Sequence, residues 1–303
     1  MTGPSITSSG ITSLPVQKVS PDHRFDTHDL IVVEEPLEIV LEYGPAGKRI
    51  EQSVSVTMRT PGDDLELALG FLFTEGILPA ITVYPASESG GPGNEASSET
   101  GNGEPGTDGS GDAPIANTIR VKLPPQVTPD LKKLQRHFYT SSSCGVCGKI
   151  SIESLYSVRP AHFRETPLTI DAGVLYPLPY LLREGQNLFD STGGLHAAGL
   201  FDRQGHLLVV KEDVGRHNAL DKLIGHALLE GNLPLNEHIL LLSGRACFEL
   251  IQKAVMAGFP IVAAVGPPSS LAIQLAQESG ITLIGFLKAQ RFNIYSGARR
   301  ILL

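Results

Sequence analysis

The sequence contains few cysteines and no long apolar run. Only three of its 303 residues are cysteines, and two of them stand close together at Cys144 and Cys147. This excludes the disulfide framework of a small secreted domain and favours a reducing compartment. No segment reaches the apolar length of a membrane span, and the first residues lack the basic start and apolar core of a signal peptide. We therefore expect a cytoplasmic protein without a membrane partner.

The chain also lacks a strong net charge outside one segment. Its formal net charge is −8, but residues 85–114 hold six acidic residues and no basic one, so the remainder carries only −2. A nearly neutral body gives no reason to expect a nucleic-acid partner. The stretch after Gly280 is basic and contains no acid. We expect this end of the chain to attract an anion.

Two segments have little to bury. Residues 1–25 are rich in Ser, Thr and Pro, and residues 85–114 contain no aromatic or branched apolar side chain. Both are expected to be disordered. The whole chain is 41% apolar, which is enough to bury a core. We predict a small α+β domain over 26–140, interrupted by the acidic insertion at 85–114, and an α/β domain over 141–303 with a cysteine loop at its start.

Local patterns predict the elements of the first domain. Alternating apolar and polar residues indicate strands at 30–33, 37–43, 54–58 and 118–123. A helix is expected to begin at Asp63 or Asp64 and to end before Gly76. A second helix over 131–139 leads to the cysteine loop.

The second half alternates short apolar strands with amphipathic helices. Strands are predicted at 194–201, 206–210, 239–242, 261–265 and 282–286. Helices are predicted at 246–257 and 269–278, and a further helix is expected to follow Asn218 as its N-cap. Such an alternation implies a largely parallel sheet covered by helices on both faces. In sheets of this kind, ligands bind beyond the carboxyl ends of the strands.

Three loops follow predicted strand ends, at 243–245, 266–270 and 287–291. They are expected to converge on one edge, where Arg245, Lys288 and Arg291 supply charge and Ser269 opens a helix whose N-terminus attracts anions. A phosphate-bearing ligand fits this set. Each loop alone is equally well explained by ordinary helix capping. None matches the Walker or dinucleotide glycine fingerprint.

A polar run at 211–218 joins a predicted strand to a predicted helix. Asp213 and His217 are candidates for an acid, a base or hydrogen-bonding groups, although a turn capped by Asn218 explains the run about as well. His196 either points into the same site or satisfies the core, and we favour the core. In the segment 58–64, Arg59 is the one residue worth testing for ligand contact.

The segment 141–149 concentrates the sulfur chemistry. Small residues and Lys149 surround Cys144 and Cys147, and such surroundings keep a thiolate accessible and lower its pKa. The alternative is a structural zinc site, which needs about two more Cys or His ligands at comparable spacing. Only Cys247 remains, far downstream.

Five motifs in order resemble the formate dehydrogenase accessory sulfurtransferase family. They are Ser142-Ser-Cys-Gly-Val-Cys-Gly-Lys149, Met58-Arg-Thr-Pro-Gly-Asp-Asp64 with Gly70-Phe-Leu-Phe-Thr-Glu-Gly76, Thr192-Gly-Gly-Leu-His196, Glu212-Asp-Val-Gly-Arg-His-Asn-Ala-Leu-Asp-Lys222 and Gly280-Ile-Thr-Leu-Ile-Gly-Phe286. The resemblance covers about residues 30–295 except the insertion.

The resemblance implies a homodimer that takes sulfane sulfur from a cysteine desulfurase and passes it to the molybdenum bis(guanine dinucleotide) cofactor. This sulfur is needed before formate dehydrogenase is active. The implied fold of the second half is a three-layer α/β/α sandwich that resembles cytidine deaminase. The cofactor is a bound substrate here, and no permanently bound metal is expected.

By the same resemblance, Cys144 is the persulfide carrier and Cys147 its partner. A mobile cysteine loop is expected, because the thiol has to travel to bound cofactor. The segment associated with the cofactor comprises Phe286, Leu287, Lys288, Ala289, Gln290 and Arg291. The sequence departs from the family pattern at Cys247, where a serine is usual, at 266–269, and in the acidic insertion.

Two other functions compete with this one. A zinc hydrolase of the deaminase kind would place a His-x-Glu or Cys-x-Glu upstream of its Cys-x-x-Cys, whereas Cys247-Phe-Glu249 comes downstream of Cys144 and Cys147. A non-catalytic cofactor chaperone would use the same loops without the thiols. A thiol-disulfide oxidoreductase is disfavoured, since the pair does not open a helix in a thioredoxin-like unit.

Overall fold

The computed structural model describes residues 6–8, 10–78, 117–130 and 168–303. The predictions that concern Cys144, Cys147, the helix at 131–139 and the acidic insertion lie outside these residues. The boundary predicted between residues 140 and 141 lies outside them as well. Within the described residues, no helix has the length and apolar character needed to cross a bilayer.

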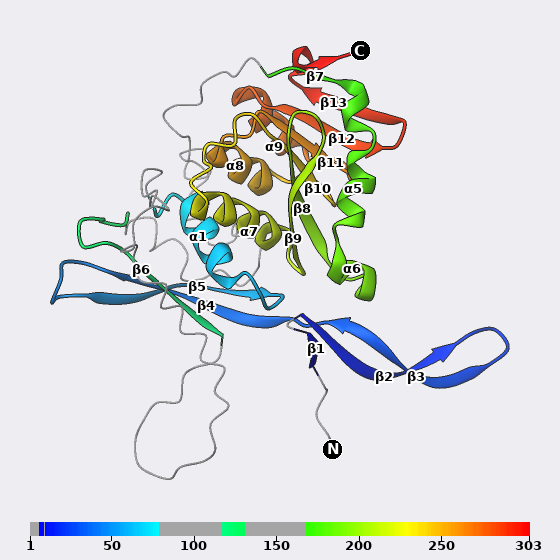
Figure 1. Cartoon of the computed structure of the whole chain (residues 1–303), viewed down its shortest axis with the longest axis horizontal. Coiled ribbons are helices and arrows are strands. Elements are labelled where there is room, and N and C mark those ends of the chain that lie inside the picture. Colours follow the sequence, from blue (N-terminus) through cyan, green and yellow to red (C-terminus); the bar gives the residue numbers. More distant parts are fainter. Residues whose placement is uncertain (1–5, 9, 79–116, 131–167) are drawn as a thin grey trace, which may run out of the picture.

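A six-stranded sheet forms the centre of the second half (Figure 1). Its order is β13-β12-β11-β10-β8-β9. The strands are β8 (His196–Phe201), β9 (Leu207–Asp213), β10 (Ile239–Leu242), β11 (Ile261–Ala264), β12 (Thr282–Lys288) and β13 (Arg291–Ser296). Within this described sheet, parallel pairing is confined to β10, β11 and β12. The prediction of a largely parallel sheet is therefore wrong at its sides, because short turns join β8 to β9 and β12 to β13 and such hairpins are antiparallel.

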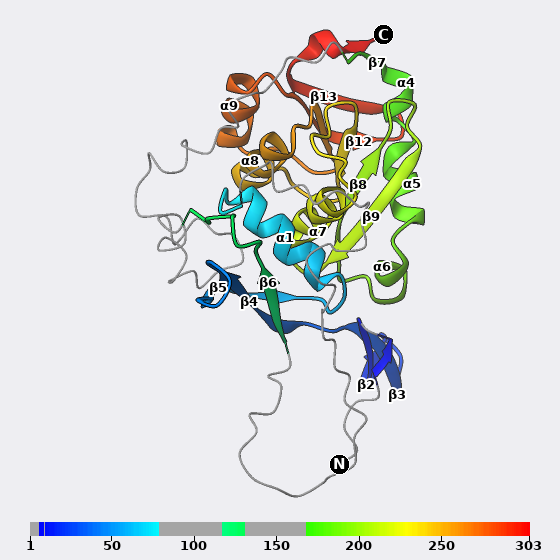
Figure 2. The same cartoon turned by 60° about the vertical axis from the view of Figure 1, so that its left-hand side comes forward.

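Helices cover both faces of this sheet, which confirms the predicted α/β/α layers (Figure 2). One face packs against α7 (Arg216–Leu229), α8 (Phe248–Ala257) and α9 (Ser270–Glu278). The other packs against α4 (Ala172–Leu175) and α5 (Leu178–Glu184), with α6 (Asn187–Thr192) following. Alternation along the strands produces this division: Leu240 points into the first core and Leu241 into the second.

The first half contributes a small sheet and one helix to the same core. Strand β4 (Glu35–Tyr43) pairs antiparallel with β5 (Ile50–Arg59) and parallel with β6 (Thr118–Lys122). Helix α1 (Asp64–Thr74) lies between this sheet and α7 (Figure 2). Its buried Leu72 belongs to one cluster with Leu220 of α7. The two predicted units are thus joined by a shared apolar core.

Two glycines allow α1 and α7 to touch through their backbones. A Cβ added to Gly70 would lie 1.9 Å from the carbonyl oxygen of Asp221, and one added to Gly225 would lie 1.8 Å from that of Glu66. Neither position could hold a larger residue at this separation. The close approach fixes α1, and with it the small sheet, on the α/β body.

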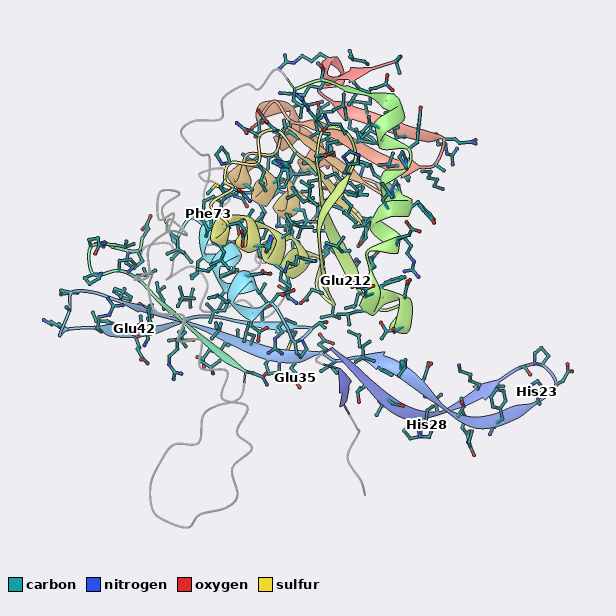
Figure 3. All side chains as sticks on the ribbon, viewed as in Figure 1. His23, His28, Glu35, Glu42, Phe73 and Glu212 are labelled. Carbon is teal, nitrogen blue, oxygen red and sulfur yellow. The ribbon has the colours of Figure 1, made fainter. Side chains whose placement is uncertain are left out.

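The expected disorder of residues 1–25 is wrong where the structure describes them. Strands β2 (Ile11–Val19) and β3 (Arg24–Val32) form a long antiparallel ribbon, and β1 (Ile6–Ser8) pairs with β2. The ribbon projects from the body, with His23 near its tip and His28 along its length (Figure 3). Cross-strand backbone hydrogen bonds hold a segment that buries little, an effect that composition alone does not reveal. A separate two-stranded sheet lies at the C-terminal side of the body. In it, β14 (Ile301–Leu302), which follows the 3₁₀ helix Ala298–Arg300, pairs with β7 (Ile170–Asp171).

Candidate functional site

The three strand-end loops do converge, as the sequence predicted. The Gly266 amide donates to the Gly244 carbonyl at 2.9 Å, the Ala246 amide to the Pro267 carbonyl at 3.2 Å, and the Phe286 amide to the Gly266 carbonyl at 3.1 Å. These bonds tie the ends of β10, β11 and β12 into one continuous edge. We call this the carboxyl edge and define it by residues 243–247, 265–270 and 285–291.

Glycines make this close packing of loops possible. A Cβ on Gly266 would lie 3.0 Å from the carbonyl carbon of Gly244, and one on Gly285 would lie 2.8 Å from the Pro268 side chain. A Cβ on Gly244 would meet the His196 ring at 3.3 Å. The absence of side chains at these three positions therefore lets the strand ends and the His196 ring pack against one another.

Helix α9 begins at this edge with a conventional cap. The Ser269 hydroxyl accepts a hydrogen bond from the Ala272 amide at 3.3 Å, which confirms Ser269 as the residue that opens the helix. Ser269 and Ser270 are both exposed. The positive end of the helix dipole thus faces solvent beside the charged Arg245 side chain, which is also exposed.

The third loop is a hairpin rather than an open loop. Strand β12 continues to Lys288, where the sequence predicted its end at Phe286, and Lys288 pairs directly with Arg291 of β13. Ala289 and Gln290 form the exposed turn. Pairing with β13 extends β12 beyond its neighbour β11, a long-range effect that local periodicity does not contain.

Phe286 is the unusual residue of this hairpin. Its backbone is left-handed, with φ 52°, at a register shift between Gly285 and Lys288. A non-glycine residue in this region costs about 1–2 kcal/mol. Phe286 is 40% exposed, whereas the neighbouring Leu287 is completely buried and has no side-chain access to a ligand. Of the predicted cofactor segment, Leu287 therefore serves the core and the remaining five residues face outward.

Beside the edge lies a second group of polar residues from α7, α8 and β8. His196 is half-buried, and burial together with Arg216 and Arg245 lowers its pKa. Of the two predicted places for His196, the structure favours the site over the core, because the residue is only half-buried and its ring lies against Gly244 at the end of β10. Arg216, the first residue of α7, was not among the predicted site residues. The sequence offers no signal for it beyond its place in a polar run.

His217 and Cys247 face each other at the centre of this group. The Nε2 atom of His217 lies 3.3 Å from the Sγ atom of Cys247. Burial lowers the pKa of His217 to about 3, and the Lys253 and Arg216 cations act in the same direction. The imidazole is therefore neutral at physiological pH. Burial and the adjacent Glu249 raise the pKa of the Cys247 thiol.

Within the described residues, His217, Cys247 and Glu249 are the one group whose ligand atoms all lie close enough to hold a metal ion, within 4.8 Å of one another. Cys247 immediately precedes α8, Glu249 is the second residue of α8, and His217 is the second residue of α7. The starts of two helices thus bring together residues far apart in the sequence.

Asp213 does not face this group and has no capacity left for a ligand. Its carboxylate is fully buried, lies 2.8 Å from the Lys222 ammonium, and accepts hydrogen bonds from the amides of Thr60 and Gly215 and from the Asn218 side chain. Asn218 is not the helix cap that the sequence predicted, because α7 begins at Arg216. Asn218 instead connects α7 to β5, since its amide nitrogen also donates to the Met58 carbonyl at 2.8 Å.

Arg59 likewise has a structural role. Its buried guanidinium forms a two-point contact with Asp64, both distances being 2.9 Å, and also forms hydrogen bonds to Asn117 and Glu35.

Glu212, at the end of β9 near α6 (Figure 3), also has a structural role, because it accepts hydrogen bonds from the amides of Leu188 and Phe189. The polar runs of the sequence thus serve mainly packing, and of Arg216 and His217 only Arg216 is partly exposed.

Comparison with known proteins was consistent over nearly the whole chain. Residues 32–302 match the model of the FdhD/NarQ family. A protein of Mycolicibacterium paratuberculosis named sulfur carrier protein FdhD is 49% identical over 274 residues, which cover 90% of this chain and 92% of that protein. One of the same name from Saccharolobus solfataricus is 36% identical over 284 residues, covering 94% and 95%. The crystal structure of a proposed formate dehydrogenase accessory protein from Desulfotalea psychrophila aligns with a TM-score of 0.63 and 23% identity, covering 97% of this chain and all of that one.

Proposed function

This chain belongs to the FdhD/NarQ family, and from that membership we propose that it is a sulfur carrier in the maturation of a formate dehydrogenase. The observation that carries the proposal is its similarity, over 90% of its length, to a protein named as a sulfur carrier. We place the protein in the cytoplasm and assign it an enzymatic role, that of a sulfurtransferase working as a homodimer.

The carrier residue in this proposal is Cys144. Its thiolate attacks the terminal sulfur of a persulfide on a cysteine desulfurase, and the desulfurase cysteine leaves as a thiolate. Cys144 then holds the sulfur as a persulfide, with no net oxidation or reduction. Cys147 has one of two roles: its thiolate attacks the inner sulfur of the Cys144 persulfide, which forms a Cys144–Cys147 disulfide and releases the outer sulfur as sulfide, or it tunes the reactivity of Cys144.

The acceptor is the molybdenum bis(guanine dinucleotide) cofactor, bound as substrate at the carboxyl edge. Three exposed cations, Arg245, Lys288 and Arg291, and the start of α9 at Ser269 suit its diphosphates. The exposed Phe286 ring offers a flat apolar surface for a base. Leu287 and Asp213 are left out of the contact set, because their side chains are buried.

The sulfur-carrier proposal is tested by mass spectrometry after incubation with a cysteine desulfurase and cysteine. We expect one added sulfur on the peptide that contains Cys144, and its loss in Cys144→Ala. Cys247→Ser is the matched control, since it removes the one cysteine outside the Cys144 and Cys147 pair, and it should still take up sulfur. A chain that gains no sulfur at Cys144 contradicts the proposal.

The same variant distinguishes the two competing functions. A cofactor chaperone would keep full activity in Cys144→Ala when formate dehydrogenase activation is measured. A zinc hydrolase built on Cys144 and Cys147 would contain stoichiometric zinc that Cys144→Ala removes. Sulfur transfer predicts failed activation in this variant and no such zinc.

A further inference from the structure

We propose that His217, Cys247 and Glu249 form a zinc-binding site. The three side chains supply an imidazole nitrogen, a thiol sulfur and a carboxylate oxygen, and these are the three ligand types that zinc takes in proteins. The sulfur-transfer proposal uses none of them as a sulfur carrier. The site also departs from the sequence-based expectation that the chain holds no resident metal.

The geometry of the site is close to that required. Ligands of a tetrahedral zinc ion with usual bond lengths are separated by about 3.6 Å. The Nε2 and Sγ atoms of His217 and Cys247 already lie 3.3 Å apart, and no two of the three ligand atoms are more than 4.8 Å apart. His217 is held by burial, at 6% exposure, while Cys247 and Glu249 are only partly buried. Rotation of the Glu249 side chain closes the remaining gap.

The ligand set also balances the charge of the ion. Zinc binding converts the Cys247 thiol to a thiolate and releases its proton to solvent. The thiolate and the Glu249 carboxylate then neutralise a divalent ion, with His217 as a neutral ligand. Lys253, the nearest buried cation, is held by Asp221, whose two carboxylate oxygens lie 2.9 and 2.8 Å from its ammonium. Arg216 remains as a positive charge beside the ion.

The composition of the site selects the metal and its coordination. A thiolate and an imidazole favour zinc over magnesium or calcium, which prefer oxygen ligands only. Three protein ligands leave the fourth tetrahedral position free, as in zinc sites that bind an exchangeable ligand. The neighbouring cations Arg216 and Arg245 make an anionic fourth ligand the favoured one.

Cobalt(II) tests the site directly, because it replaces zinc and its thiolate complexes absorb light. The chain has three cysteines, so the double variant Cys144→Ala/Cys147→Ala keeps Cys247 alone. In this variant we expect cobalt to produce a thiolate-to-metal charge-transfer band together with tetrahedral d–d bands, and added zinc to displace both. The readout does not depend on sulfur transfer, so failure here leaves the sulfur-carrier proposal standing.

Three further variants in the double-variant background assign the ligands. Cys247→Ser should abolish the charge-transfer band. His217→Gln and Glu249→Gln should each weaken zinc binding by more than the roughly 10- to 100-fold that loss of an outer-shell partner costs. His206→Gln, which alters an exposed histidine in the β8–β9 turn, is the control and should bind zinc unchanged. Circular dichroism of each variant checks that the fold is retained.

Absence of the charge-transfer band in the folded double variant overturns the proposal. So does a band that survives Cys247→Ser, or zinc affinity that is the same in His217→Gln and His206→Gln. Adventitious binding by scattered surface histidines would give the last result.

Discussion

Asp221 and Lys253 show what a buried charge requires from its neighbours. Both are nearly inaccessible to solvent, and the Lys253 ammonium contacts the carboxylate as well as the Thr74 hydroxyl at 2.9 Å. Burial raises the pKa of Asp221 to about 6, although Lys253 opposes this shift. The pair stands between α1, α7 and α8, so each helix depends on it.

Replacing Asp221 by Asn should destabilise the protein by about 3 kcal/mol, the lower end for a broken buried ion pair, because it leaves the buried Lys253 charge with only the Glu75 carboxylate, 3.5 Å away, as counterion. Urea unfolding of Asp221→Asn against the unaltered chain measures the change. The double variant Asp221→Leu/Lys253→Met removes both charges and should lose less than Asp221→Asn. A single variant as stable as the double variant would contradict this account.

Phe286 combines backbone strain with an exposed aromatic ring. Phe286→Gly relieves a left-handed conformation worth about 1–2 kcal/mol, partly offset by the greater flexibility of glycine in the unfolded chain. We therefore expect unfolding stability to stay level or rise, while binding of guanosine diphosphate weakens about tenfold. Calorimetric unfolding and binding titrations separate these effects. Arg203→Ala, at the exposed β8–β9 turn, is the control for binding, and a loss of stability in Phe286→Gly would show that the ring serves packing instead.

At the scale of single residues, sequence reasoning located the carboxyl edge but misassigned several of its neighbours. Strand ends and glycines identify Arg245 and Ser269 because those signals are local. His196 lies beside the edge through its contact with Gly244, Arg216 acts on His196 from the start of α7, and Asp213 is held away by a network that reaches Thr60 in the first half. Such long-range pairings have no counterpart in the local pattern.

Among the elements, α1 and α7 have the tightest contact. Gly225→Ala should cost more than about 3 kcal/mol, the upper end of ordinary overpacking, because the new methyl group meets the Glu66 backbone rather than a movable side chain. Gly194→Ala is the matched control, since its nearest neighbour is the Val32 side chain at 3.4 Å. Chemical denaturation distinguishes them. Equal stability of the two variants would mean that the helices separate easily.

Elements with a strong local signal were predicted well, and those set by pairing were not. Strand β10 has the predicted bounds, and α9 follows its predicted Ser269 cap. Both were predictable because an apolar run and a helix cap each depend on residues that are neighbours in the sequence. The β12–β13 hairpin and the β2–β3 ribbon depend on partners in the sheet. Composition even favoured disorder for the ribbon, since cross-strand hydrogen bonds do not require an apolar sequence.

On the scale of the whole molecule, the ribbon contributes little to the stability of the body. Val19 and Phe25 near its tip are 69% and 47% exposed, and its base meets the body at Gly10 and Val32. Replacing residues 14–29 by Asn-Gly, a favoured two-residue hairpin turn, keeps the base paired. We expect the melting temperature to change by less than about 2 °C, the lower end of the shift that a 1 kcal/mol change causes in a large domain. A larger drop in a thermal melt would show that the ribbon supports the core.

The projecting ribbon also affects how the size of the protein should be measured. A body with a long, narrow extension has more friction with the solvent than a sphere of the same mass, so it leaves a sizing column early (Figure 1). An elution volume read against spherical standards would then suggest a dimer even for a single chain. Light scattering, which reports mass without regard to shape, is the measurement on which the proposed homodimer should be judged.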